Sequence, residues 1–366
     1  MVTRRQMGCY LGGVALASGS NAVFGQAKRV FRAANPIGVV DAQQSFVTCG
    51  RHPKLNYYAI ENVDLDFVNM NSITQAMVAV STAQAEFASL NPLLYLPAVA
   101  KEPQLGIIAA YNWLPRQANC VVVKPDSPIK TIADLKGKRI GLRNQGDGGV
   151  VVMNTMFAEL KLDPASLEFV AIGDGGVAGK ALIDGRVDAM ATFDTQAARI
   201  EAVGMPLRYL PLTPNYSRLS SGWWGFKKDV VERERKAVIG FCRAAAKSTL
   251  FAHTNLDQAI NIHWQLYPES KSRSKSDDEA RAEIAMILKD RKNNWIRRPD
   301  DPDQRWGASS TAEWQAYLQI ASESSKNPQL AAQVGSLNNV FTNELVDEIN
   351  NFDKAAVIRQ AKEFQI

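Results

Sequence analysis

The sequence predicts an α/β protein of two lobes, each built on a parallel or mixed sheet, from three observations. Short apolar segments alternate with helical segments over residues 30–203, a pattern typical of strands joined by right-handed crossover helices. A weak internal repeat relates residues 83–88 to residues 185–190, because each has a small residue and a polar residue, then an acid, before a strand. The chain of 366 residues is long enough for two domains.

The elements of the first half follow from apolar patterning and from turn residues. In order, they are a strand at 30–34, a loop and helix over 42–60, a strand at 65–68, a helix over 72–80, a strand at 86–89, a helix over 93–99 and a strand at 105–110. Asn71 and Ser72 are cap candidates for the helix over 72–80, and Gln75 stands three residues beyond Ser72, at capping-box spacing.

The second half repeats the alternation and then becomes helical. In order, it has strands at 120–123 and 139–142, a helix over 150–160, a strand at 169–172, a helix over 177–183, a strand at 187–191, a helix over 196–203, a strand from 223, and helices over 230–251, 255–266, 277–292, 310–324 and 342–364.

Two glycine-rich loops, at 146–149 and 173–176, each join a predicted strand to the start of a helix. Such a loop presents backbone N–H groups to an anion or a carbonyl group. The first loop lacks the lysine of a nucleotide-binding P-loop and the third glycine of a dinucleotide fingerprint. Because both loops follow parallel strands, they point to one crevice. The alternative is a pair of tight turns without a ligand.

Catalytic chemistry is hard to assemble from this chain. Of three histidines, His253 and His263 lie in the helical part, where packing or surface roles are expected. His52 follows Cys49 by three residues, so a Cys/His dyad remains conceivable. We find no serine-nucleophile elbow and no zinc-ligand spacing. The sequence therefore predicts no catalytic residue, metal or cofactor.

Aromatic residues at strand ends are candidates for the wall of a ligand cleft. Trp113 follows Asn112 at the end of one predicted strand, and Trp223 and Trp224 begin another. The alternative for each tryptophan is packing in the core or in the seam between lobes.

Residues 1–27 are predicted to be an export signal. Arg4 and Arg5 precede a weakly apolar run and a small-residue cleavage site at 25–27, which favours a twin-arginine signal over an ordinary secretory one. Removing this segment leaves 40 basic and 37 acidic residues, too balanced for a nucleic-acid binder. The sequence contains no run of 18 or more apolar residues, so a membrane-spanning helix is not expected. Three cysteines remain, Cys49, Cys120 and Cys242, as buried thiols or as one disulfide with a thiol left over.

Three segments carry a resemblance to a known family: SPIKTIADLKGKRIG at 127–141, ALIDGRVDA at 181–189 and TNELVD at 342–347. They resemble the periplasmic substrate-binding proteins of ABC importers, in the nitrate/sulfonate/taurine (NMT1/THI5-like) group. The resemblance implies a type II periplasmic-binding-protein fold, with two lobes joined by crossing strands near 119–125 and 223–228. Lobe 1 then covers residues 28–121 and 226–366, and lobe 2 covers residues 122–225.

The same resemblance implies a monomeric exported receptor in the periplasm. It would trap a small organic or anionic ligand and deliver it to an ABC permease and its ATPase. Neutral donors are expected to bind the ligand as readily as a point charge, although Arg143 is close. Asp194 would accept from the ligand or form a salt bridge across the lobes. The predicted ligand-binding residues are Gln44, Ser45, Asn71, Ser72, Asn91, Asn112, Trp113, Asp147, Gly148, Gly149, Asp174, Asp194 and Trp223.

Two alternative functions stay open. One is an enzyme on the same fold, either a hydrolase or a protein like the eukaryotic pyrimidine synthases of this group, with Cys49 and His52 as its reactive pair. The cysteine-rich, histidine-dependent site of those synthases is not matched, which argues against an enzyme. The other is a sensor that binds a ligand and docks on a signalling partner.

Overall fold

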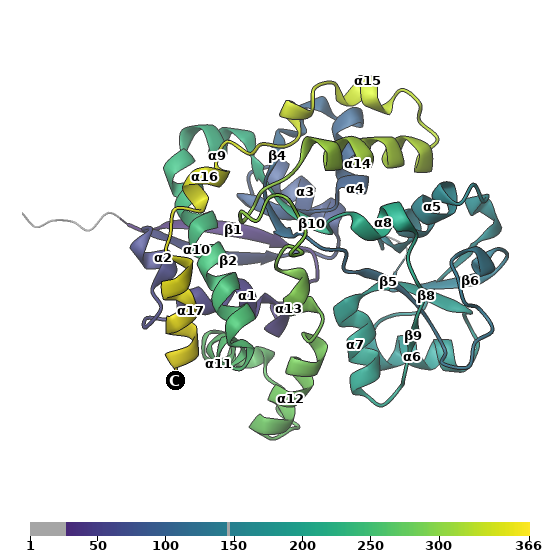
Figure 1. The fold of residues 1–366 in the computed structure, drawn as a ribbon, viewed down its shortest axis with the longest axis horizontal. Coiled ribbons are helices and arrows are strands. Elements are labelled where there is room, and N and C mark those ends of the chain that lie inside the picture. The colour runs from purple at the N-terminus through teal and green to yellow at the C-terminus, as the bar shows by residue number, and fades with distance from the viewer. Residues whose placement is uncertain (1–26, 145–146) are drawn as a thin grey trace, which may run out of the picture.

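The computed structural model describes residues 27–144 and 147–366, so the predicted export signal, apart from Ala27, lies outside the described residues. Figure 1 shows two bodies side by side, each a sheet with helices against its faces. Each body contains a five-stranded mixed sheet, which is the α/β class that the sequence predicted.

The first sheet consists of β1 (Arg29–Asn35), β2 (Val63–Asn69), β3 (Phe87–Leu90), β4 (Ile107–Leu114) and β10 (Gly222–Lys227). Its spatial order is β2-β1-β3-β10-β4. The strands β1, β2 and β3 run parallel, and β10 is antiparallel to both of its neighbours.

The second sheet consists of β5 (Asn119–Val123), β6 (Arg139–Leu142), β7 (Glu168–Ala171), β8 (Ala189–Phe193) and β9 (Arg208–Tyr209). Its spatial order is β7-β6-β8-β5-β9, with β6 parallel to β7 and β8 and with β5 antiparallel to β8 and β9. In each sheet one strand, β1 or β6, lies between the next two parallel strands of the chain, and an antiparallel strand, β10 or β5, follows in the spatial order. The two segments of the sequence repeat lead into equivalent strands of this order, β3 and β8.

Two linkers join the sheets, residues 115–118 between β4 and β5 and residues 219–221 before β10. Ser221 holds them together: the Ala118 amide donates to its hydroxyl at 2.6 Å, and its own amide donates to the Leu114 carbonyl at 2.8 Å. The predicted boundaries, 121/122 and 225/226, fall inside β5 and β10. Since a boundary there divides a hydrogen-bonded strand, we propose to place it at the linkers. Below, lobe 1 means residues 27–114 and 222–366, and lobe 2 means residues 119–218.

Most helices belong to lobe 1. They are α1 (Ser45–Thr48), α2 (Tyr57–Ile60), α3 (Ile73–Ser81), α4 (Pro92–Lys101), α9 (Lys228–Arg233), α10 (Arg235–Thr254), α11 (Leu256–Leu266), α12 (Asp277–Ile287), α13 (Arg291–Asn294), α14 (Thr311–Ser324), α15 (Leu330–Val334), α16 (Val346–Ile349) and α17 (Lys354–Glu363). Lobe 2 has α5 (Gly149–Glu159), α6 (Gly175–Ile183), α7 (Asp194–Ala202) and α8 (Pro214–Arg218). Short 3₁₀ helices lie at Ala42–Gln44, Cys49–Arg51, Pro103–Leu105, Ala133–Leu135, Pro164–Ser166, Pro268–Ser270 and Leu337–Asn339.

Four long predicted helices are interrupted, those over 42–60, 230–251, 277–292 and 342–364. Over 42–60, Pro53 forces His52 into an extended conformation (φ −60°, ψ 135°), and Asn56 adopts a left-handed one (φ 57°), so the segment divides into short pieces. Over 342–364, Asp353 accepts from the Ala356 amide and starts a new helix, α17. Helix continuity depends on these local breaks more than on apolar spacing.

The long helix α10 forms the centre of lobe 1. Its Phe241 ring lies within 4.8–5.8 Å of the rings of Phe31, Phe87 and Trp224, all of them buried. Burying each such side chain stabilises the fold by about 1.5–3 kcal/mol. Helices of lobe 1 also pack directly on lobe 2, with α14 on α5 and α12 on α7. Within residues 27–144 and 147–366, no helix combines the length and the apolar character needed to cross a membrane.

Candidate ligand-binding site

A pocket of about 230 Å³ opens where the carboxyl ends of β1 and β3 meet lobe 2. Lobe 1 supplies most of its lining, whereas lobe 2 adds Asn119, Arg143 and Phe193. Most lining side chains are apolar, and six are aromatic: Phe46, Phe67, Phe87, Trp113, Phe193 and Trp224. Ligands of open α/β sheets bind at this edge, because the strands end there and the loops diverge.

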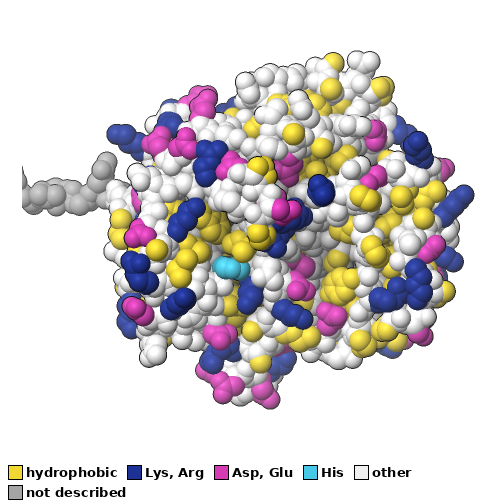
Figure 2. Space-filling view, in the orientation of Figure 1, with side chains coloured by type: hydrophobic (Ala, Val, Ile, Leu, Met, Phe, Trp, Pro, Cys, Tyr) yellow, Lys and Arg dark blue, Asp and Glu magenta, His cyan; other side chains and the backbone are white. Residues whose placement is uncertain are grey.

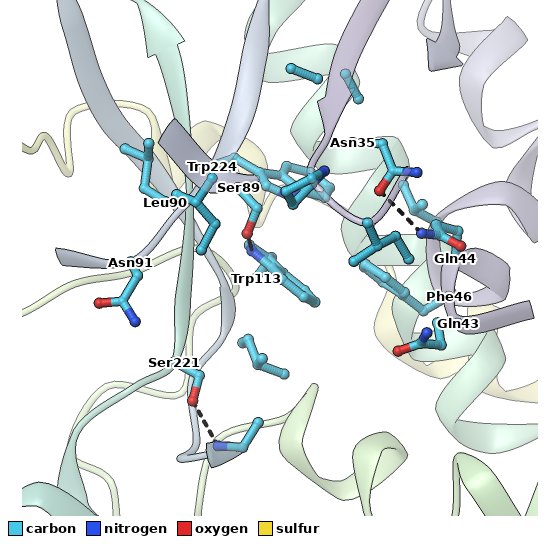
Figure 3. A pocket seen from close by; sticks show the side chains of 18 of the residues that line it. Asn35, Gln43, Gln44, Phe46, Ser89, Leu90, Asn91, Trp113, Ser221 and Trp224 are labelled. Carbon is cyan, nitrogen blue, oxygen red and sulfur yellow. Dashed lines mark hydrogen bonds between the residues drawn. The ribbon is translucent and has the colours of Figure 1, made fainter. Parts of the chain in front are cut away.

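Trp113 lies at the centre of the pocket view in Figure 3. Its indole N–H donates to the Ser89 hydroxyl at 3.1 Å, and its ring stacks on Phe46 with centroids 5.3 Å apart and planes 12° from parallel. A hydrogen bond at one end and a stacking partner on one face fix the ring. It therefore offers a rigid, flat, apolar surface.

Neutral polar groups surround this surface (Figure 3). The Asn91 carbonyl caps α4 by accepting from the Leu93 amide at 2.9 Å, which leaves its NH₂ group with no hydrogen-bond partner among the described residues. Gln44 accepts from the Asp41 amide and makes a long contact of 3.5 Å to Asn35. The amide groups of Asn91 and Gln44 can therefore still donate to a ligand.

Arg291 and Arg143 are the charged side chains among the described lining residues. The Arg291 guanidinium is engaged with Asp194, because its Nε donates to both carboxylate oxygens at 3.0 Å and a terminal nitrogen donates to one of them. Asn294 donates to the same carboxylate at 2.8 Å. Both charges are nearly buried, with side-chain exposures of 8% and 11%.

Arg143 is held more loosely. It follows β6, and its Nε lies 3.7 Å from an Asp147 carboxylate oxygen, beyond hydrogen-bond distance. The other Asp147 oxygen accepts from the Gly149 amide at 2.8 Å. Burial raises the pKa of Asp147, and Arg143 and the Gly149 amide offset that rise in part. Asp147 therefore carries its charge at a cost in desolvation.

Contacts beside the pocket join the two lobes directly. Asp194 begins α7 of lobe 2, and its partners Arg291 and Asn294 lie on α13 of lobe 1. The Thr195 hydroxyl donates to Gln43 at 2.6 Å, and Arg199 forms an ion pair with Asp41. We call this set the interlobe latch; it comprises Asp41, Gln43, Asp194, Thr195, Arg199, Arg291 and Asn294.

The predicted site residues divide into three groups. Gln44, Asn91 and Trp113 line the pocket. Asp194 forms the cross-lobe salt bridge that was one of its two expected roles, and Asp147 reaches the site through Arg143. The others, which do not line the pocket, are Ser45, Asn71, Ser72, Asn112, Gly148, Gly149, Asp174 and Trp223.

In each glycine-rich loop, an aspartate of the loop occupies one of the backbone donors that were expected to face a ligand. The Gly149 amide donates to Asp147, and the Gly175 amide donates to Asp174 at 2.7 Å. A Cβ at Gly149 would lie 2.6 Å from the Leu142 side chain, so close packing of α5 requires this glycine. In each loop, one backbone donor is therefore already occupied by an aspartate of the loop, and Gly149 also serves the close packing of α5.

The remaining polar candidates serve local structure. Ser72 caps α3 by accepting from the Gln75 amide, as predicted, but the cap lies outside the pocket. The side-chain NH₂ group of Asn112 donates to the Ser220 hydroxyl at 3.0 Å in the core. Ser45 is buried in α1.

The two tryptophans of β10 lie on opposite faces of the strand, and it is Trp224, not the predicted Trp223, that lines the pocket. Trp223 is fully buried and donates to the Ser309 hydroxyl at 2.6 Å, whereas Trp224 lines the pocket and stacks on Tyr111. Successive side chains of a strand point to opposite faces, so one of the pair had to enter the core. The expectation that Trp223 faces the cleft is corrected.

The Cys49/His52 pair lies away from the pocket. Cys49 is fully buried with its thiol directed at the Ser248 carbonyl, and the burial raises the pKa of that thiol. The His52 ring packs edge-on against Phe364. Neither residue lines the pocket. The described cysteines Cys49, Cys120 and Cys242 are free thiols.

A family model described as NMT1/THI5 like matches residues 52–259. The periplasmic aliphatic sulphonate binding protein SsuA from Escherichia coli superposes with a TM-score of 0.61 at 14% identity, covering 82% of this chain and 94% of that one. The ligand binding component of an ABC-type import system from Staphylococcus aureus, solved with zinc bound, gives 0.58 at 13% identity, covering 89% and 100%.

An enzyme shares the architecture as well. The desulfurization enzyme DSZB superposes with a TM-score of 0.50 at 17% identity, covering 88% of this chain and 99% of the other. Together these likenesses establish the fold, which is that of the periplasmic binding proteins. The choice between capture and catalysis therefore depends on the residues of the pocket.

Proposed function

Because the chain belongs to the NMT1/THI5-like family, we propose that it is an exported receptor that binds a small organic molecule between its lobes. The receptor presents this ligand to an ABC permease driven by its ATPase. The similarity to a periplasmic binding protein and to a component of an ABC import system supports both the location and the partner.

The chemistry of the pocket lining is the observation that carries this proposal. Among the described residues that line it there is no Cys, His, Asp, Glu, Lys or Tyr. Its two hydroxyls, on Ser89 and Ser221, are both hydrogen-bonded to neighbouring protein groups. Covalent or acid–base catalysis needs a nucleophile with a base, or a titratable group within reach of the substrate. A pocket with apolar walls and neutral amides is suited to binding.

Lobe closure supplies the mechanism. The latch residues of lobe 1 and lobe 2 meet in the arrangement described here, with the pocket beside them. A ligand that touches both walls favours this closed arrangement by its extra affinity for it. A permease that recognises the closed form then receives loaded receptor in preference to empty receptor.

The enzyme alternative remains open through the fold of DSZB, but it lacks support from the residues named for it. Cys49 is inaccessible, and its raised pKa keeps it protonated near neutral pH. An acyl-transfer or desulfurising role through this pair therefore requires a rearrangement of the core around α10.

A thermal-shift screen tests the proposal. The panel holds aliphatic and aromatic carboxylates, sulfonates, their neutral amides, and pyrimidines. A ligand present at 100 times its dissociation constant adds about 2.7 kcal/mol of apparent stability. We expect at least one class to raise the melting temperature without being consumed. Turnover of a panel compound, with no compound raising the melting temperature, contradicts the receptor function.

A further inference from the structure

The pocket combines a positive charge with an apolar wall, and this combination limits the ligands it suits. Its described lining contains two arginines and no acid. Arg291 is neutralised by Asp194 in a nearly buried pair with three hydrogen bonds to that carboxylate. Its guanidinium is therefore committed to the latch.

The Arg143 guanidinium is less strongly engaged than that of Arg291. Its side chain is 24% exposed, and the ion-pair contact found for it among the described residues is the 3.7 Å approach to Asp147. Its Nε is buried and has no hydrogen-bond partner there. An arginine with weakly engaged donors beside a pocket is suited to a planar anionic group, which accepts two parallel hydrogen bonds.

The wall of the pocket on lobe 1 is flat and aromatic. Trp113 and Phe46 form a stacked, rigid surface on lobe 1, and Trp224 and Phe67 extend the apolar lining. Phe193 adds a further ring from lobe 2. A flat apolar body buries the most area against such a wall and loses little conformational entropy.

This inference rests on the proposed function and deepens it. We propose that the ligand is a monoanion with a flat apolar body, and that Arg143 binds its charged group by exchanging Asp147 for the ligand. Trp113 and Phe46 hold the body on lobe 1, and Arg143 holds the charge from lobe 2. One ligand molecule then contacts both lobes. The contact with Arg143 therefore both selects an anion and stabilises the closed arrangement of the lobes.

The exchange has a chemical basis. Asp147 keeps its contact with the Gly149 amide whether or not Arg143 turns away. The ligand anion takes over the role of counter-ion, so the arginine is never left uncompensated in the pocket. Because Asp147 is the competitor, removal of its charge strengthens anion binding, whereas removal of Arg143 weakens it.

The test measures dissociation constants by calorimetry for matched acid and amide pairs: benzoate and benzamide, 2-naphthoate and 2-naphthamide, and indole-3-acetate and its amide. Benzenesulfonate is added as a second anion type. In the unmodified protein we expect the anions of at least one scaffold to bind at least tenfold more tightly than the amide. We expect Arg143→Gln to weaken those anions at least tenfold and the amide less than threefold.

Two further variants separate recognition from folding. Asp147→Asn keeps an acceptor for the Gly149 amide, and we expect it to bind anions more tightly than the unmodified protein does. Arg139→Gln is the matched control, because Arg139 pairs with Asp188 at the opposite end of β6. It should leave all dissociation constants unchanged.

Four outcomes overturn the inference: amides that bind as tightly as their acids, an Arg143→Gln variant that weakens both equally, an Asp147→Asn variant that does not bind anions more tightly, or failure of every anion to bind. The receptor function is judged separately, since binding of any other compound in the wider thermal-shift panel preserves that function when this inference fails.

Discussion

The two walls of the pocket are built from different chemistry. Lobe 1 provides the stacked rings of Phe46 and Trp113, whose positions are set by the sheet and by a hydrogen bond to Ser89. Lobe 2 provides Arg143 beside Asp147, and the nearby start of α7 with Asp194. Surface charges of both signs are interspersed over the face shown in Figure 2, so this contrast is local to the seam.

Under the proposed function, this difference assigns a separate role in ligand binding to each wall. A rigid apolar surface holds a ligand body in either state of the protein, because its shape does not depend on lobe 2. Charged groups whose partners lie in the other lobe, or in the ligand, change their energy when the lobes meet. Lobe 1 therefore sets affinity for the body of the ligand, and lobe 2 couples its charge to closure.

Removal of the aromatic surface is expected to have the largest effect. Trp113→Ala deletes a rigid ring from the centre of the pocket, and we expect ligand binding to fall about 100-fold, as for a central aromatic hot spot. Calorimetry with a ligand from the screen measures this. Trp223→Phe is the matched control: loss of its bond to Ser309 should lower the melting temperature and leave the dissociation constant unchanged. Equal affinity of Trp113→Ala and unmodified protein contradicts the role of lobe 1.

Breaking the latch is expected to have the next largest effect. Asp194→Asn leaves the Arg291 charge without its counter-ion, which is costly while the lobes stay closed. Because opening rehydrates that charge, we expect a roughly tenfold loss of affinity and a larger radius of gyration by small-angle X-ray scattering. Asp184→Asn removes an exposed pair on lobe 2 and should do neither. A compact Asp194→Asn protein with full affinity means that the latch does not control closure.

Loss of the Thr195 hydroxyl at the seam is expected to matter less. Thr195→Val keeps the shape of the side chain and removes the hydrogen bond to Gln43 together with a long 3.5 Å contact from Arg291. One such bond contributes about 1 kcal/mol, so ligand affinity should fall about fivefold or less. A loss as large as that of Asp194→Asn shows that shape at this position, rather than charge, governs the seam.

The smallest expected effect is on stability and its pH dependence at lobe 2. Burial raises the pKa of Asp147, with a further contribution from nearby Asp174. Stability from its protonated form is fully present below its ordinary pKa of about 3.9 and is lost as pH rises through the raised value. Asp147→Asn should therefore be more stable than the unmodified protein at pH 7, and the difference should vanish toward pH 4. Melting temperatures across this range test the sign; a variant less stable at pH 7 shows that Arg143 outweighs the burial.

The sequence was informative where structure is local. Strands and their turn residues showed the two lobes, and the rule that ligands gather at strand ends identified Asn91, Trp113 and Gln44. The sequence could not show which of Trp223 and Trp224 faces the pocket. Both faces of β10 are buried, so no polar residues alternate with the apolar ones to mark one face. Arg291 lies 97 residues from Asp194, and nothing near either residue indicates the pair. Arg143 directly follows a predicted strand, a position that could have identified it, but its exposure depends on tertiary packing.

Hydrogen–deuterium exchange with and without a saturating ligand tests the central claim, that the ligand is held between two unlike walls. We predict protection on both lobes: at residues 43–48 and 89–95 of lobe 1, and at residues 147–152 and 194–199 of lobe 2. A second pocket, of about 850 Å³ and lined in part by residues 297–313, should be unaffected. Protection confined to one lobe, or located in that second pocket, contradicts the account.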